Sequence, residues 1–358
     1  MAGPAARDPR SIDAVLRHRG GNDRFRSSDD SVRLGDIVLR NRLVTSSSLL
    51  GYGVSNSAVV PYGMSPISTF VPLAEFGAVT TRTLTVEPRE GHFTTRDDYV
   101  LRELPGLLKR YGTVLRGTDG GWLNAFGWCN VGIDAYLRHY YPRTRDQRVI
   151  ISLGGFSALE FATLVDRVNA AVPAGEIAAV ELNVSCHNVN FDFTTILQDV
   201  LDEAVHRSNH PVILKLSPDY DYLHNARQAA AAGVSALTAI NTVKALRLDP
   251  RTGTPWLANR YGGLSGRAIK PIGLRVVSEL RESGVTLPII ATGGIRTMDD
   301  CREYFWAGAD AVSLGSATWL ASYPGYALAP LRALQVRRLL KAVRRYEPLP
   351  VGTAAPWR

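Results

Sequence analysis

Short apolar runs recur along the chain, and each ends in small or polar residues. The runs occupy residues 43–47, 78–83, 149–154, 178–185, 211–217, 236–242, 288–294 and 311–317. Continuous apolar runs rich in β-branched residues are typical of strands buried on both faces of a parallel sheet. Eight such strands with intervening helices predict an α/β fold of the (β/α)8 TIM barrel type rather than an open doubly wound sheet.

Three segments between these runs carry helix signals. Residues 157–172 begin with a serine followed three residues later by a glutamate, which is a capping box. Residues 267–284 end on a glycine, as a helix C-terminus favours. Residues 297–309 begin with a threonine and early acidic residues. Each segment follows a predicted strand, as the barrel requires.

The same pattern divides the 358 residues into three parts. Residues 1–35 are polar, with interspersed Arg and Asp, and predict an N-terminal extension outside the core. Residues 36–345 hold all eight runs and predict the barrel domain, with an elaborated second connection over residues 84–148. Residues 346–358 are predicted to form a C-terminal tail.

Positive charge is concentrated near the C-terminal end. The formal net charge is +8, and residues 331–358 contain seven Lys or Arg against a single Glu. We interpret this segment as a basic helix with a solvated face, followed by the tail. Nucleic-acid contact is the alternative interpretation, but the segment has no aromatic interleaving or known binding motif. No nucleic-acid partner is therefore expected.

Composition excludes several classes of protein. No stretch approaches about 18 apolar residues, so no membrane span is expected. The N-terminal residues lack the apolar core of a secretory signal. The cysteines Cys129, Cys186 and Cys301 lie at no CxxC spacing, which argues against a disulfide scaffold, a metal site or an iron–sulfur cluster. A cytoplasmic location follows as the expectation.

Polar residues gather at the carboxyl ends of the predicted strands. In a barrel these ends converge on one mouth, which is where active sites of this fold lie. The sequence therefore predicts an enzyme whose site is formed by Ser47, Arg82, Ser152, Asn183, Ser185, Lys215, Asn241, Thr242, Gly293, Gly294, Gly315 and Ser316.

Glycines mark the last three predicted strand-to-helix connections. They occur in GGLSG (262–266), ATGGI (291–295) and LGSA (314–317). Backbone N–H groups in such turns can surround a phosphate, and the loops after strands seven and eight are the usual phosphate site of barrels. The alternative is that the glycines only permit tight turns. We favour a phosphate site, and with it a nucleotide cofactor such as FMN.

The segment ELNVSCHN (181–188) places two amides and a thiol at one strand end. Asn183 and Asn188 offer the donors and acceptors that a cyclic amide substrate requires. Cys186 can remove a proton from a ring carbon while a flavin accepts hydride from the neighbouring carbon. The alternative is an inert small apolar residue, which we assign to Cys129 and Cys301. His187 is a candidate acid or base, although a turn residue is the favoured interpretation.

Lys215 interrupts the apolar run VILKLS, and only five lysines occur in the chain. Burying an unpaired ammonium is costly, so Lys215 is expected either to face the barrel mouth or to pair with an acid. An ammonium at the mouth can stabilise negative charge on a reduced flavin.

In their order, these motifs resemble the class 1 dihydroorotate dehydrogenases, FMN enzymes on a (β/α)8 barrel. The resemblance covers about residues 36–320 and includes RNRLVTSSSLLGYG (40–53), GAVTTRTLTVEPREG (77–91) and NAFGWCNVG (124–132). Residues 241–274 are most similar to members that pass electrons to NAD through a separate iron–sulfur flavoprotein subunit. The resemblance implies oxidation of dihydroorotate to orotate in pyrimidine biosynthesis, and a homodimer is typical of the family. The electron acceptor stays open among fumarate, a quinone and a partner subunit.

Residue roles carried over by position stay implications of this resemblance. Cys186 would be the base that abstracts the C5 proton. A cysteine at this position indicates class 1, since class 2 enzymes have a serine there. The substrate would be held by Asn124, Phe126, Gly127, Trp128, Asn183, Asn188, Asn241 and Thr242. FMN would be held by Ser47, Thr83, Ser152, Asn183, Lys215, Ile240, Gly266, Gly293, Gly294, Gly315 and Ser316.

The chain departs from the family pattern at several positions. Arg82 stands where the family has a lysine, and we count Arg82 with Cys186 and Lys215 as the catalytic residues. His187 replaces a proline, and Trp128 is larger than the usual aliphatic residue. Where the family has Asn-Pro, this chain has Asn41-Arg42, and where the family has Ala-Ser-Gly, this chain has three serines at residues 46–48. The loop after Asn188 is shorter than in typical members of the family. These changes keep three alternatives open: the same chemistry on another dihydropyrimidine or cyclic amide, a non-redox phosphate-binding isomerase or lyase, and a basic binding protein.

Overall fold

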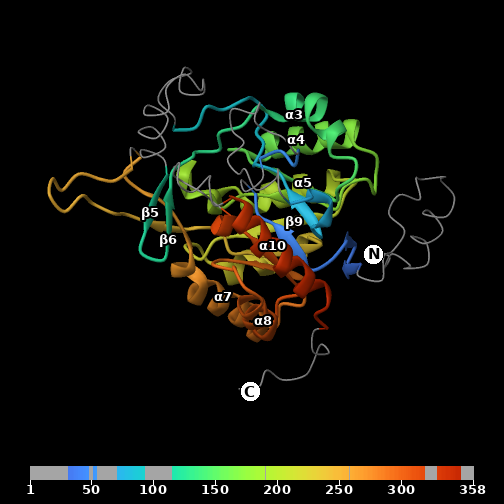
Figure 1. The fold of residues 1–358 in the computed structure, drawn as a ribbon. Helices are drawn as coiled ribbons and strands as arrows, with labels where there is room; N and C mark the ends of the chain where they lie inside the picture. Colours follow the sequence, from blue (N-terminus) through green and yellow to red (C-terminus); the bar gives the residue numbers. More distant parts are fainter. Residues whose placement is uncertain are drawn as a thin grey trace.

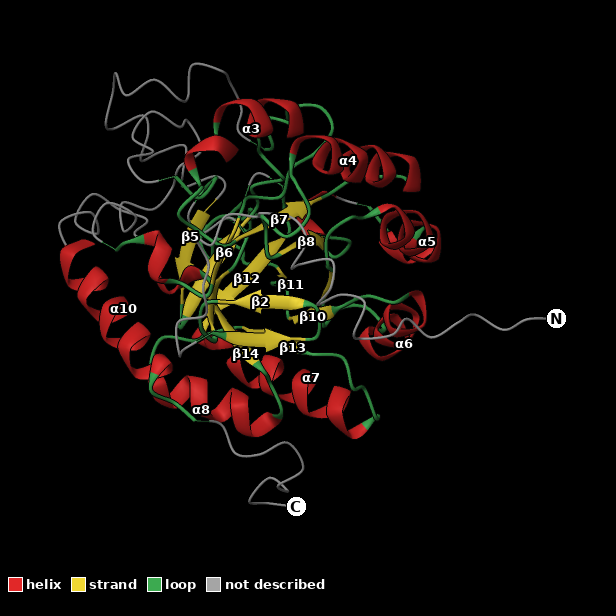
Figure 2. Ribbon diagram, turned by 90° about the vertical axis from the view of Figure 1, so that its right-hand side faces the viewer, coloured by secondary structure: helices red, strands yellow, loops and turns green. Residues whose placement is uncertain are grey.

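The computed structural model describes residues 31–47, 51–54, 71–92, 115–189, 191–257, 259–318 and 329–347. A closed barrel of parallel strands forms its centre (Figure 2). In chain order the strands are β3 (Leu43–Thr45), β4 (Ala78–Thr80), β7 (Val149–Leu153), β8 (Ala179–Leu182), β9 (Val212–Leu216), β10 (Ala236–Ala239), β13 (Ile289–Thr292) and β14 (Ala311–Leu314). Each pairs with the next of these strands, and β14 closes the barrel on β3. The predicted TIM barrel and all eight of its strands are confirmed.

Each barrel strand ends before the polar end of its predicted run. The run 178–185, for example, forms β8 only as far as Leu182. Asn183 and Ser185 follow the strand and stay buried. The final polar residues leave the hydrogen-bonded ladder because the backbone turns there into the loops of the barrel mouth. The pattern thus located the strands and, just beyond them, the residues that face the mouth.

Helices surround the barrel (Figure 2). They are α3 (Ile133–His139), α4 (Ala158–Ala171), α5 (Leu197–Arg207), α6 (Tyr222–Ala232), α7 (Lys270–Glu282), α8 (Met298–Ala307) and α10 (Ala329–Arg344), with the 3-10 helices η4 (Leu73–Glu75), η6 (Tyr141–Arg143), η7 (His187–Val189), η8 (Phe193–Thr195), η9 (Arg267–Ile269) and η10 (Ser316–Thr318). Ser157 caps α4 as predicted, but the Glu160 side chain accepts from Phe156 N rather than from Ser157 N, so the predicted capping box is incomplete. A complete capping box forms on α8 at Thr297. The helix predicted from 267 begins as η9 and becomes α7 at Lys270. In the described residues no helix is long and apolar enough to cross a membrane.

The basic helix predicted near the C-terminus is α10. Val336, Leu339 and Leu340 are buried in the main hydrophobic core, so this helix packs its apolar positions against the barrel. Its basic residues Arg337, Arg338 and Lys341 are exposed, as a solvated face requires. In Figure 1 the helix lies across the front of the barrel. The tail predicted at 346–358 falls outside the described residues from 348 onward.

A hairpin that the pattern did not predict covers the amino ends of the barrel strands. It consists of β1 (Val32–Leu34) and β2 (Ile37–Leu39), which pair antiparallel. Leu34, Ile37 and Leu39 are buried in one cluster with residues near the amino ends of the barrel strands. The chain therefore packs on the barrel from about residue 32 onward, while residues 1–30 of the predicted extension lie outside the described residues.

A second unpredicted element is an antiparallel sheet at the barrel mouth, in the order β11-β12-β6-β5. Its strands are β5 (Leu115–Thr118), β6 (Gly121–Asn124), β11 (Val243–Ala245) and β12 (Gly262–Gly266). The segment GGLSG lies in the connection between β10 and α7, as predicted, but it forms the strand β12 rather than a loop, and its last residue, Gly266, lines the cavity at the barrel mouth. A Cβ at Gly262 would lie 2.5 Å from Asn124 O, and one at Gly263 would lie 2.1 Å from Thr242 Oγ1. These glycines permit close strand packing.

Candidate active site

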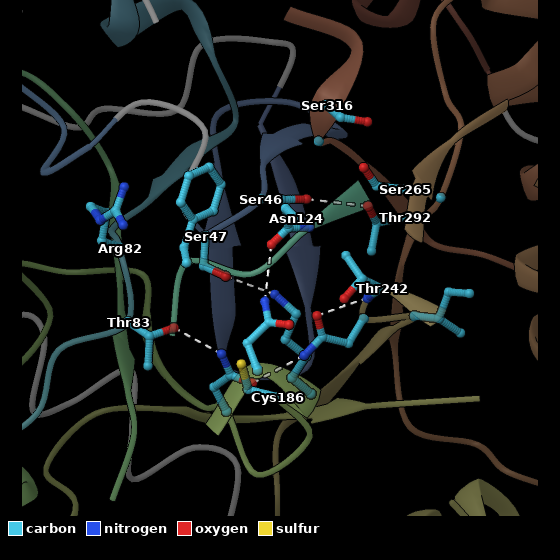
Figure 3. A pocket seen from close by; sticks show the side chains of 18 of the residues that line it. Ser46, Ser47, Arg82, Thr83, Asn124, Cys186, Thr242, Ser265, Thr292 and Ser316 are labelled. Atoms are coloured by element: carbon cyan, nitrogen blue, oxygen red, sulfur yellow. Dashed lines mark hydrogen bonds between the residues drawn. The ribbon is translucent and has the colours of Figure 1, made fainter. Parts of the chain in front are cut away.

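One cavity lies at the carboxyl ends of the barrel strands, beneath the antiparallel sheet (Figure 3). Its walls come from residues far apart in the sequence, and Arg82 and Ser316 stand on opposite sides of it in this view. The lining residues are Ser46, Ser47, Arg82, Thr83, Asn124, Phe126, Gly127, Trp128, Cys129, Asn183, Cys186, Asn188, Lys215, Ile240, Asn241, Thr242, Ser265, Gly266, Ile269, Thr292, Gly293, Gly294, Gly315 and Ser316. The residues named from the sequence that do not line it are Ser152, Ser185 and the candidate acid or base His187. Ser185 lies next to the lining residue Asn241, whose Nδ2 donates to Ser185 Oγ at 3.0 Å.

Ser152 lies behind the cavity wall rather than in it. Its side chain is fully buried at the end of β7 and shares a hydrogen bond of 3.1 Å with Thr83 Oγ1. Its hydroxyl also donates to Glu181 Oε1 at 3.1 Å. Thr83 in turn accepts from Asn183 Nδ2 at 2.8 Å. Ser152 is therefore placed to hold two neighbouring side chains in position.

Lys215 both lines the cavity and pairs with an acid. Its Nζ donates to Ser47 Oγ at 2.8 Å and lies 3.4 Å from Glu181 Oε1. Both partners of this ion pair are about 95% buried. The other oxygen of Glu181 accepts from Thr238 Oγ1 at 3.0 Å. The buried carboxylate is thus fully surrounded by donors, which is the condition under which a buried ion pair is tolerated.

Glu181 was not recognised from the sequence. The available signal was a glutamate inside the buried run AAVELNVS, two residues before Asn183 and so on the same face of the strand. A carboxylate at such a position needs a cationic partner, and the apolar run VILKLS of the next strand contains one lysine. Matching the single charged residue of one run with that of the next would have identified Glu181 as the partner of Lys215.

Four asparagines join the loops around the cavity. Asn124 Nδ2 donates to Gly263 O at 2.8 Å and Asn188 Nδ2 donates to Asn124 Oδ1 at 3.0 Å. Asn241 Nδ2 donates to Asn183 Oδ1 at 3.2 Å. Asn188 Oδ1 is buried and accepts from no partner among the described residues. An unsatisfied buried acceptor is costly, so this atom favours a ligand that brings an N–H group.

Cys186 lies in the loop between β8 and η7. Burial raises the pKa of its thiol to about 11, although the Asn188 backbone and the positive charges of Lys215 and Arg89 oppose this shift. A raised pKa keeps the sulfur protonated at neutral pH, which makes the thiolate a strong base once it is formed. Cys129 also lines the cavity, but Cys301 is buried in α8 with a pKa raised by burial to about 12.

Arg82 follows β4 and is held by the turn that precedes α3. Its Nε donates to Cys129 O at 2.9 Å, and its Cζ lies 5.9 Å from the centre of the Phe126 ring. In the same turn Trp128 has a φ of 55°, and its ring packs 5.5 Å from Phe156. The backbone and an aromatic ring thus orient the guanidinium at the edge of the cavity.

The glycines after β13 and β14 form the opposite end of the cavity. A Cβ at Gly294 would lie 2.8 Å from Gly266 O, so the backbone of the turn after β13 closely approaches the end of β12. At Gly315 an added Cβ would make ordinary contacts with the hydroxyls of Ser46, at 3.7 Å, and Thr292, at 4.0 Å, so polar atoms lie in front of this backbone. Together with the Ser316 hydroxyl, these turns form a polar recess suited to a phosphate.

The comparisons with known proteins agree with this site. The family model described as dihydroorotate dehydrogenase matches residues 63–327. The chain is 35% identical to the dihydroorotate dehydrogenase B (NAD(+)) catalytic subunit of Desulforamulus reducens, with 82% of this chain and 88% of that protein covered. Subunits of the same name from Geobacter sulfurreducens and Geobacillus kaustophilus are 36% and 34% identical, over 82% and 81% of this chain and 88% and 85% of theirs. The chain therefore belongs to the class 1 dihydroorotate dehydrogenase family, as its motifs predicted.

Proposed function

We propose that this chain oxidises dihydroorotate to orotate, with FMN as its cofactor. The observation that carries the proposal is the convergence, in one cavity, of a thiol, four ring-binding amides and a polar recess. The unsatisfied Asn188 Oδ1 in particular matches an N–H of a cyclic amide. The test is anaerobic bleaching of the bound flavin by dihydroorotate, with dihydrouracil as the competing substrate. Faster bleaching by dihydrouracil, or a protein that stays colourless with added FMN, would contradict the proposal.

The residues present fit FMN in two respects. The glycine turns after β13 and β14 and the hydroxyl of Ser316 suit its phosphate, and the Lys215 ammonium suits the negative charge of a reduced flavin. When bound, FMN supplies the hydride acceptor of the reaction. We assign its binding to Ser47, Thr83, Asn183, Lys215, Ile240, Gly266, Gly293, Gly294, Gly315 and Ser316, with Ser152 as a support.

In this proposal some residues bind the substrate and another removes its proton. Asn124, Asn188 and Asn241 hold the ring through their amides, with the backbone of Phe126, Gly127 and Trp128 near the carboxylate, and Asn183 and Thr242 complete the ring contacts. Cys186 removes the C5 proton. The positive charges of Lys215 and Arg89 act on Cys186 and favour the thiolate that this step consumes.

The pH dependence of the reaction follows from the thiol. Because the pKa of Cys186 is raised to about 11, the thiolate fraction falls as the pH drops below that value. We expect the rate constant for flavin reduction by dihydroorotate to rise about tenfold per pH unit between about pH 7 and pH 10, measured anaerobically by stopped flow. A profile that is flat over this range would assign the proton to another base.

Arg82 provides a separate prediction, because the family has lysine there. Arg82 keeps the positive charge, but its guanidinium is planar, and its Nε donates a hydrogen bond to the Cys129 carbonyl oxygen. We expect Arg82→Lys to change dihydroorotate turnover by less than about threefold or to improve it, since all four ring-binding asparagines are present. The measurement is kcat/KM, with Arg82→Met as the control that removes the charge. A decrease of more than about tenfold in the kcat/KM of Arg82→Lys for dihydroorotate would indicate that the site is shaped for another substrate.

We also propose that electrons leave through a separate NAD-reducing subunit, as the names of the relatives suggest. Adding the electron-transfer subunit of the Geobacter sulfurreducens enzyme should allow dihydroorotate to reduce NAD, whereas the chain alone should not. Comparable turnover with fumarate or a quinone, without any partner, would contradict this. A cytoplasmic location and a homodimer, which light scattering tests, complete the proposal.

A further inference from the structure

His187 lies next to Cys186 and has no role in the proposed reaction as described so far. It begins η7, and its side chain is only 4% exposed. Its Nε2 lies 2.7 Å from Asp219 Oδ2 and 2.8 Å from Ser217 Oγ. Since the family motif has proline at this position, the buried imidazole and its two polar partners require an explanation specific to this chain.

Asp219 is held as a carboxylate. Burial alone would raise its pKa, but hydrogen bonds from His187, from the Lys244 backbone amide and from Ser217 hold the pKa of Asp219 below its ordinary value. Its Oδ2 accepts from Lys244 N at 2.8 Å. A carboxylate only accepts hydrogen bonds, so His187 Nε2 carries a proton whether the ring is neutral or charged. The ring orientation is therefore fixed.

This contact joins the loops after three neighbouring barrel strands. His187 follows β8, Ser217 and Asp219 follow β9, and Lys244 lies in β11, which follows β10. The ring of Tyr220 covers the imidazole, with the ring centres 5.5 Å apart. Of the other charged groups nearby, Asp192 acts on Tyr220, while Lys215 and Arg89 act on Cys186.

Residues on both sides of Cys186 are anchored. On its N-terminal side, Ser185 Oγ accepts from Asn241 Nδ2 at 3.0 Å. On its C-terminal side, beyond His187, Asn188 is held by Asn124 Oδ1 at 3.0 Å and accepts at its carbonyl from His92 Nε2. His187 itself is held by Asp219 from the opposite side of the loop. Removing the His187 contact leaves the loop attached through Ser185, through Asn188 and through the strand. A displacement of about 1 Å in a reacting group can lower a rate by about 100-fold.

We propose that His187 and Asp219 form a positioning pair that fixes the Cys186 thiol relative to the ring-binding amides. This inference rests on the proposed role of Cys186 as the base. His187 acts through the loop and does not touch the substrate. The imidazole supplies a hydrogen bond where the family motif supplies the stiffness of proline.

The test uses His187→Ala, Asp219→Asn and the double variant as FMN-loaded proteins. Each single variant should reduce flavin about tenfold more slowly at saturating dihydroorotate, with KM changed by less than about twofold. The double variant should be no slower than either single variant, because both changes break one contact. His187→Gln, which retains an N–H donor, should recover most of the rate. His206→Ala, an exposed histidine on α5, is the matched control and should behave as the unmodified protein.

A second readout does not depend on the substrate. Alkylation of Cys186 by iodoacetamide, followed by mass spectrometry, should be at least about threefold faster in both single variants, because the released loop opens more often. The buried Cys301 is the internal control. Additive rate losses, unchanged alkylation, or a lowered melting temperature with normal rates would each overturn the positioning role. If the unmodified protein is not reduced by dihydroorotate, the proposed function fails, while alkylation still decides whether the pair fixes Cys186.

Discussion

Replacing Cys186 by alanine is expected to leave an FMN-loaded protein that dihydroorotate reduces at least about 100-fold more slowly, the usual scale for a positioned base. The recess assigned to the phosphate is formed by the turns after β13 and β14, and Ser316 of this recess lies across the cavity from Cys186 (Figure 3), so cofactor content should not change. The measurement is the anaerobic rate at which the visible absorption of the bound flavin bleaches, with the flavin-to-protein ratio determined for each preparation.

The controls for this prediction are the other two cysteines. Cys129→Ala alters a second thiol of the same cavity, and Cys301→Ala alters a buried thiol in α8. Both should be reduced within about threefold of the unmodified rate, because neither is assigned proton transfer. Cys186→Ser should retain activity at high pH only, since a hydroxyl ionises less readily than a thiol. Near-normal reduction of Cys186→Ala would remove Cys186 from the reaction.

The barrel was predictable because its strands are buried on both faces. That burial leaves apolar runs such as residues 149–154 without alternation, and β7 forms within this run with every residue buried. The polar residue after each run was predictable for the same reason, since a polar side chain cannot lie in the apolar interior without partners. Most of the site could therefore be located before the structure was known.

The antiparallel sheet at the mouth could not be predicted in this way. Its strand β12 contains three glycines in five residues, so it carries no strand signal of its own. The reason for the glycines lies in distant residues, because Asn124 and Thr242 occupy the space that side chains would need. Sequence shows the composition of such a strand but not its neighbours.

Site interactions that depend on two distant side chains were also missed. Lys215 was predicted either to face the mouth or to pair with an acid, and the structure shows both, with Glu181 as the acid. His187 was interpreted as a turn residue, and it does begin η7, but its contact with Asp219 depends on the packing of two loops. In both cases the interacting residues are far apart in the sequence. His187 and Ser217 are separated by 30 residues, and Lys215 and Glu181 by 34.

Variants of Lys215 and Glu181 distinguish an effect on the stability of the fold from an effect on the reaction. Lys215→Met removes the ammonium and leaves a buried carboxylate with only the hydroxyls of Ser152 and Thr238 as donors. We expect this variant to lose about 3–5 kcal/mol in the free energy of unfolding, measured by urea denaturation, because one partner of a buried ion pair remains uncompensated. The melting temperature should fall accordingly.

The double variant Lys215→Met with Glu181→Gln is the decisive partner of this experiment. It removes both charges, so most of the lost stability should return, since replacing a buried pair as a whole is often close to neutral. The flavin-reduction rate should stay at least about 100-fold low in both variants, because neither has a cation to stabilise the charge that develops on the cofactor. Glu181→Gln alone should keep the rate, as it retains the ammonium and its contact with Ser47. If the double variant instead regains both stability and rate, Lys215 is only a structural counter-ion to Glu181, and the charge required by the reaction must come from Arg82.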